Sequence, residues 1–98
     1  MKIESQVQDQ TLNMKVSGRL DTTTAPNLEV ALMEKIPGMR EIILDFQDLE
    51  YISSAGLRVL LSTLKYIGNR AEMKIIHVNE TIMNIFEVTG FTDILTIE

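Results

Sequence analysis

Residues 41–69 read EIILDFQDLEYISSAGLRVLLSTLKYIGN, and they contain both units of an α/β fold. Glu41–Phe46 carries three consecutive apolar residues at 42–44, which is typical of a strand buried on both faces. After a short loop, we predict a helix from about Ser54 to Ile67, because the apolar residues follow the helical period: Leu57, Leu60, Leu61, Leu64 and Ile67. Gly68-Asn69 then supplies a helix stop.

Before this stretch, two segments alternate in the manner of strands. Met1–Gln8 alternates around two apolar residues, and Thr11–Ser17 places Leu12, Met14 and Val16 on one face. Asp9-Gln10 between them reads as a tight turn, so the two strands are predicted to form a hairpin. Gly18 ends the second strand or marks a bulge near its end.

Pro26 indicates where the first helix starts. Proline has no backbone N–H, so it fits the first turn, where helical N–H groups lack partners. The N-cap is therefore expected near Thr23 or Thr24, and Asp21 falls in the loop just upstream. A stripe at four-residue spacing follows, made of Leu28, Leu32 and Ile36, and Pro37-Gly38 stops the helix.

After residue 69, Met73–Val78 reads as another buried strand. Asn79 is a suitable cap for a third helix that turns Ile82, Ile85 and Phe86 inward, with Gly90 past its end. The pattern of Asp93–Ile97 fits either a short strand or a short helix.

The predicted order is strand-strand-helix-strand-helix-strand-helix, followed by a short final element. This alternation predicts a single α/β domain over residues 1–98, with three or four helices. Its sheet is mixed and mostly parallel, with four or five strands and an N-terminal antiparallel hairpin. Binding sites gather beyond the carboxyl ends of parallel strands. There the Asp21 loop, the loop from Asp45 to Ser54 and the loop after His77 are expected to meet.

Composition excludes several classes of function. A net charge of −5 without any Lys/Arg cluster argues against nucleic acid as a partner. With no cysteine and one histidine, disulfides, thiol chemistry and multi-histidine metal sites are excluded, and we expect no cofactor. No G-x-S-x-G elbow is present, so we expect no enzyme. Apolar runs are too short for a bilayer, which predicts a cytoplasmic protein with no membrane association.

Residues 48–57, DLEYISSAGL, hold the most informative motif, and they allow two interpretations. In the first, Ser53 only caps the free N–H groups of the helix and Gly56 only lets the helix pack close to the sheet. In the second, Ser54 is phosphorylated, since a helix N-terminus tolerates added negative charge well. Ala55 and Gly56 would then allow a partner to approach closely.

Four motifs in the same order along the chain resemble those of the STAS family, which includes the anti-sigma factor antagonists of bacteria. They are Gly18-Arg19-Leu20-Asp21, Ala25-Pro26, Tyr51-Ile52-Ser53-Ser54-Ala55-Gly56-Leu57 and Phe86-Glu87-Val88-Thr89-Gly90-Phe91. The resemblance covers nearly the whole chain and implies a single STAS domain.

The resemblance also implies a partner-switching role controlled by reversible phosphorylation. Such proteins bind an anti-sigma factor that is also a serine kinase, and a PP2C-type phosphatase removes the phosphate that this kinase adds. Family members carry an Asp-Ser-Ser/Thr-Gly pattern, which places the phosphoacceptor on Ser54, with Ser53 as the second candidate. Here Ser53 stands where the family has Asp, and Ala55 where it has a second hydroxyl residue.

By the same resemblance, the partner-binding surface comprises Asp21, Ser53, Ser54, Ala55 and Gly56. We expect the free protein to be a monomer. STAS domains also serve as adaptor subunits in larger assemblies without a phosphorylation cycle, and the Ser53 substitution keeps this alternative open.

Overall fold

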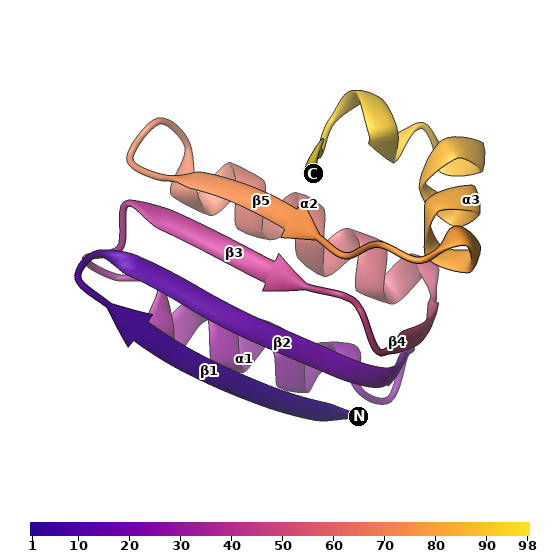
Figure 1. Ribbon diagram of the computed structural model, residues 1–98, viewed down its shortest axis with the longest axis horizontal. Helices are drawn as coiled ribbons and strands as arrows, with labels where there is room; N and C mark the ends of the chain where they lie inside the picture. Colours follow the sequence, from indigo (N-terminus) through magenta and orange to yellow (C-terminus); the bar gives the residue numbers. More distant parts are fainter.

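The computed structural model describes residues 1–98 as a twisted sheet with two long helices packed on one face (Figure 1). Its strands are β1 (Lys2–Gln8), β2 (Thr11–Leu20), β3 (Glu41–Asp45), β4 (Leu49–Ile52), β5 (Glu72–Ile76) and β6 (Thr96–Ile97). Its helices are α1 (Ala25–Lys35), α2 (Ser54–Ile67), α3 (Glu80–Thr89) and a 3-10 turn, η1 (Phe91–Asp93).

The sheet has the strand order β1-β2-β3-β5-β6, and β4 pairs with the far end of β2. β1 and β2 are antiparallel, whereas every other pair is parallel. The hairpin turn lies at Asp9-Gln10, where Asp9 adopts a positive φ of 56°. The predicted α/β class, the hairpin and the mostly parallel sheet are confirmed.

The core lies between the sheet and the two helices α1 and α2. Alternate residues of the central strands face it, and the predicted stripes of both helices meet them, except that Leu61 of α2 is half-buried and lies outside the core. Each fully buried aliphatic side chain contributes about 1.5–3 kcal/mol. The main members from the sheet and from α1 are completely buried: Leu12, Val16, Ile42, Leu44, Leu28 and Leu32.

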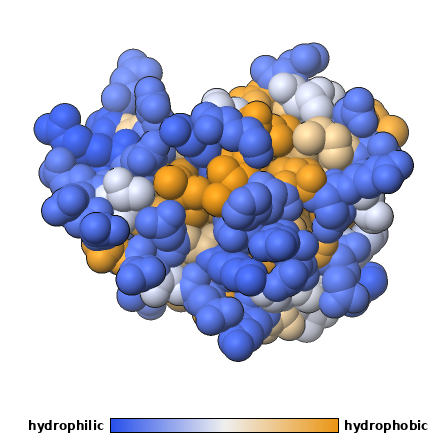
Figure 2. All heavy atoms as spheres, viewed as in Figure 1, coloured by the Kyte–Doolittle hydropathy of each residue, from blue (hydrophilic) through white to orange (hydrophobic).

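The opposite face of the sheet is open, which corrects the expectation that Glu41–Phe46 is buried on both faces. β3 alternates, so Ile42 and Leu44 are buried while Ile43 is only half-buried. No helix crosses this face (Figure 1). Figure 2 shows apolar atoms in its middle with hydrophilic side chains around them. The three consecutive apolar residues of β3 therefore alternate between the face covered by helices and the face that is partly exposed.

A sixth strand, β4, was missed by the sequence prediction, which treated this segment as loop. β2 pairs with β3 over Thr11–Lys15 and with β4 over Gly18–Leu20. The register shifts between Gly18 and Arg19 and β2 continues to Leu20, so of the two alternatives for Gly18 the structure favours the bulge over the strand end. One long strand therefore joins the body of the sheet to the segment that leads into α2.

The helix boundaries follow their predicted caps. Thr24 is the N-cap of α1, with Pro26 in the first turn. Ser53 caps α2 and Asn79 caps α3, and Gly90 ends α3 in the left-handed conformation. The open question at residues 93–97 resolves into η1 followed by the short strand β6. No helix has the length and apolar character needed to span a membrane.

Candidate functional site

The loop after β2 and the start of α2 lie side by side at the carboxyl end of the sheet. Leu20 and Ile52 are paired residues at the ends of β2 and β4. The backbone N–H of Ser53 then donates to the carbonyl oxygen of Leu20 at 2.9 Å. The structure therefore brings Asp21, which follows Leu20, next to the serine motif, as the sequence predicted.

Ser53 and Ser54 have different environments. Ser53 is extended (φ −93°, ψ 175°), and its half-buried side chain accepts a hydrogen bond from the N–H of Gly56 at 3.4 Å. Its carbonyl oxygen accepts from the N–H of Leu57 at 2.9 Å. Ser54 is the first residue of α2 and is exposed. Ser53 is thus the helix cap, and Ser54 is the accessible hydroxyl.

Gly56 lies on the buried face of α2, which packs against the sheet. A Cβ atom at this position would lie 2.8 Å from Ile52 Cγ1 and 2.8 Å from Leu20 Cγ. The absence of a side chain therefore lets α2 approach β2 and β4 closely. Of the predicted partner surface, Gly56 is buried, so the packing interpretation applies to it, whereas Ala55 is half-buried at the edge of the site.

The Asp21 side chain organises the turn that leads into α1. Its Oδ1 accepts hydrogen bonds from the backbone N–H groups of Thr23 and Thr24, at 3.0 and 3.1 Å. The bond from Thr24, with the other bonds from this turn and the nearby charge of Arg19, lowers the pKa of the Asp21 carboxyl below its ordinary value. Asp21 is half-buried, and it holds this turn without being the helix N-cap.

A cation and an aromatic ring lie beside the serine motif on the paired strands. Arg19 is opposite Tyr51 in the register of β2 and β4, with its guanidinium carbon 4.5 Å from the ring centroid. This distance is typical of a cation–π contact. Arg19 also lies 3.9 Å from the carboxylate of Asp21.

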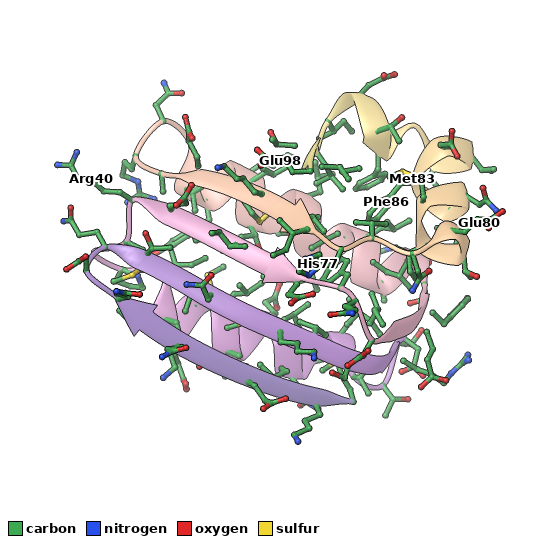
Figure 3. The ribbon with its side chains drawn as sticks, viewed as in Figure 1. Arg40, His77, Glu80, Met83, Phe86 and Glu98 are labelled. Atoms are coloured by element: carbon green, nitrogen blue, oxygen red, sulfur yellow. The ribbon has the colours of Figure 1, made fainter.

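Two further polar side-chain pairs occupy the same end of the sheet. The ring nitrogen Nδ1 of His77 lies 3.1 Å from Asp45 Oδ1, joining the ends of β5 and β3. Figure 3 shows His77 at this end of β5, whereas Arg40 lies at the other end of the sheet. Lys15 Nζ lies 3.0 Å from Asp48 Oδ2, and this contact raises the pKa of the lysine.

Sequence reasoning missed these two pairs and used His77 only to mark the start of a loop. The alignment of β3 with β5 was the available signal, because parallel neighbours place their carboxyl ends together. Lys15 therefore offsets the negative charge of Asp48 near the serine motif. Side chains able to bind a metal do not gather in groups of three or more.

The STAS domain family model matches residues 2–98 of this chain. The anti-sigma-B factor antagonist of Staphylococcus aureus (strain NCTC 8325 / PS 47) is 35% identical over 97 residues, covering 97% of this chain and 90% of that protein. An anti-sigma factor antagonist from Mycobacterium paratuberculosis has a similar structure, with a TM-score of 0.89 and 22% identity, over 98% of this chain and 83% of that one.

The Bacillus cell fate determinant SpoIIAA, solved in its phosphorylated form, also has this fold. Its TM-score is 0.75 at 16% identity, and the match covers 99% of this chain and 91% of that chain. At such low identities the two solved structures establish the fold that they share with this chain.

Proposed function

Because this chain belongs to the STAS domain family, we propose that it acts in the cytoplasm as an anti-sigma factor antagonist. The relative at 35% identity is named for this role, and the match extends over nearly the full length of both chains. In this function the protein binds an anti-sigma factor, which then releases its sigma factor. It changes the partner of another protein and transforms no small molecule.

The exposure of the Ser54 hydroxyl is the observation that carries the regulatory part of the proposal. The neighbouring Ser53 hydroxyl is engaged as the cap of α2, whereas Ser54 is exposed at its first residue. A phosphate adds about −1.5 to −2 charge near neutral pH. The free N–H groups and the dipole of a helix N-terminus favour such a charge. Phosphorylation of Ser54 would therefore disturb the fold little.

The switch follows from where this phosphate would lie. The partner-binding surface comprises Asp21, Ser53, Ser54 and Ala55, which adjoin one another at the ends of β2 and β4. A phosphate on Ser54 adds bulk and charge to the exposed part of this surface, so a partner that fits the neutral serine is repelled. The anti-sigma factor acts as the serine kinase, and a PP2C-type phosphatase restores the binding form.

Incubation with ATP and the anti-sigma factor encoded in the same genome tests this assignment. Intact-mass analysis of the wild-type protein is expected to show one added phosphate, and Ser54→Ala is expected to show none. Ser53→Ala is the matched control and should still accept the phosphate. A phosphate that remains in Ser54→Ala would place the modification elsewhere.

The second candidate function is a STAS adaptor subunit that is never phosphorylated. Ser53 favours it, because the family pattern has an acidic residue there and this chain uses a neutral helix cap. Stable binding to the anti-sigma factor without any phosphate transfer, in the same assay, would support this alternative.

A further inference from the structure

A groove runs between the outer faces of α1 and α2, away from the sheet. It consists of two adjoining hollows, of about 270 Å3 near the Ser54 turn and about 500 Å3 further along the helices. Glu29 and Ser62 line both hollows, so the groove is continuous. We call it the α1–α2 groove, and its other lining residues are Thr22, Ala25, Pro26, Val30, Met33, Glu34, Ala55, Arg58, Val59 and Tyr66.

The far half of the α1–α2 groove is apolar and accessible. Val30 is 57% exposed and Tyr66 is 41% exposed, although both are large apolar side chains. Met33 lines the same half and is half-buried. The two helices are anchored to the core by other residues, such as Leu28 and Leu60, which are completely buried. Ala25 and Val59, in the half of the groove near Ser54, belong to this core, but the exposed side chains of Val30 and Tyr66 do not. Exposed apolar side chains grouped in this way favour an interaction site.

The charges along the groove favour a basic occupant. Glu29 and Glu34 lie on its α1 side, and neither takes part in an ion pair of the chain. Arg58 is the one cation in the lining, and it lies in the hollow near the Ser54 turn. A bound helix would meet the two free carboxylates on its α1 side, although the guanidinium carbon of Arg70 also lies 5.1 Å from the centroid of the Tyr66 ring. Arg58 would suit its C-terminal end, where helical carbonyl oxygens are free.

We propose that the α1–α2 groove receives a basic amphipathic helix of the anti-sigma factor. The apolar face of this helix packs on Val30, Met33 and Tyr66, and its Lys or Arg residues face Glu29 and Glu34. From Ala55 to Tyr66 the groove spans about 16 Å of α2, which accommodates roughly three helical turns. The identity of the partner rests on the function proposed above, whereas the chemistry of the occupant rests on the groove itself.

The apolar half of this groove, around Val30, Met33 and Tyr66, lies about three helical turns along α2 from Ser54, so a phosphate on Ser54 does not block contact there. The groove thus contributes affinity in both states of the switch. We expect the phosphorylated protein to keep a weak residual affinity for the anti-sigma factor that depends on the groove. Such a contact would keep the phosphorylated protein close to its kinase.

A charge introduced into the apolar half of the groove tests the proposal on the whole protein. Val30→Glu should lower affinity for the anti-sigma factor of the same genome by about tenfold or more, since it places a third carboxylate in the apolar part. Val88→Glu is the matched control, because Val88 is 88% exposed on α3 and lies outside the groove. Both variants should melt like the wild type. Equal affinity of Val30→Glu and Val88→Glu for the partner would overturn the groove proposal.

A peptide experiment separates failure of the groove from failure of the proposed function. We would titrate the isotope-labelled protein with a 16-residue amphipathic peptide of leucines and lysines, and with the same peptide carrying glutamates for lysines. The lysine peptide should shift NMR signals of Val30, Met33 and Tyr66, and the glutamate peptide should not. Binding of the lysine peptide elsewhere, or equal binding of both peptides, contradicts the groove. If the anti-sigma factor itself fails to bind wild type, the proposed function falls while this titration still decides the groove.

Should the protein instead occupy the groove with a second copy of itself, sedimentation would reveal a dimer that Val30→Glu dissociates. That result would also overturn the proposal.

Discussion

The hydroxyl of Ser53 is bound to the backbone of α2, whereas that of Ser54 faces solvent. Sequence reasoning placed Ser54 in the first helical turn, because Ser is a preferred N-cap and Leu57 begins the apolar period. It could not assign the cap to one serine, since two adjacent serines fit the same pattern. That distinction depends on the extended backbone of Ser53, which the end of β4 imposes.

Gly56 offers a test of close packing at the residue scale. Gly56→Ala places a methyl group about 2.8 Å from Leu20 and Ile52, which cannot both retreat without moving a strand. We expect a loss of about 1–3 kcal/mol in the free energy of unfolding, measured by urea denaturation. Arg58→Ala, on the exposed side of the same helix, should change stability by less than about 0.5 kcal/mol. Unchanged stability of Gly56→Ala would refute the close packing.

The Asp21 carboxylate should stabilise the fold by an amount that depends on pH. Its pKa is lowered in the folded state, chiefly by the N–H of Thr24. Folding therefore favours the carboxylate, and this stabilisation is present above the unfolded pKa of about 3.9. It is lost as pH falls through the lower, folded pKa.

Thermal melting of wild type and Asp21→Asn at two pH values measures this contribution. Near pH 6 the wild type should melt higher, because the amide oxygen accepts the same N–H groups without a charge. Near pH 2 the difference should shrink towards zero, since the wild-type carboxyl is then protonated. A difference of equal size at both pH values would show that charge is not the cause.

At the scale of elements, the strongly periodic segments were predictable and the context-dependent ones were not. α2 was predicted with its boundaries, since five apolar residues and a glycine stop mark it. β4 was missed because Leu49–Ile52 has buried ends and exposed middle residues, without alternation. The pairing of β4 depends on the bulge at Gly18 and on the length of β2. Neither can be read from the four residues of β4 alone.

The same limit applies to the open face of the sheet. Ile43 belongs to an apolar run that also fits a strand covered on both sides. Only the three-dimensional arrangement shows that α1 and α2 cover one face and α3 lies at the end of the sheet (Figure 1).

Asn79 joins α3 to β4, and its removal should lower the free energy of unfolding. Its Oδ1 accepts from the N–H of Ile82, and its Nδ2 donates to the carbonyl oxygen of Leu49 at 2.7 Å. Asn79→Ala removes both the cap of α3 and the contact between α3 and β4. We expect a loss of about 1–2 kcal/mol in chemical denaturation. Thr81→Ala is the control, because Thr81 is exposed at the second residue of α3. An equal loss of stability in the two variants would contradict the capping role of Asn79.

At the scale of the whole molecule, we expect phosphorylation to change the surface and leave the fold intact. Ser54 is the first residue of α2 and lies outside the core, so its phosphate adds negative charge where the helix dipole favours it. The phosphorylated protein should melt at the same temperature as the unmodified protein, or slightly higher. Backbone amide NMR shifts should be confined to the turns around Asp21 and Ser54. Shifts that extend through β3 and β5 would indicate remodelling of the domain.

We propose that the surface around the unmodified Ser54 binds an anti-sigma factor and that phosphorylation of Ser54 prevents this contact. Calorimetric titration of this protein against the anti-sigma factor of the same genome, before and after phosphorylation, measures the difference. We expect tight binding of the unmodified protein and of Ser54→Ala. For the phosphorylated protein we expect a loss of affinity of at least about a hundredfold, a difference of about 2.7 kcal/mol. Equal affinity of the unmodified and phosphorylated proteins would show that phosphorylation of Ser54 does not control binding.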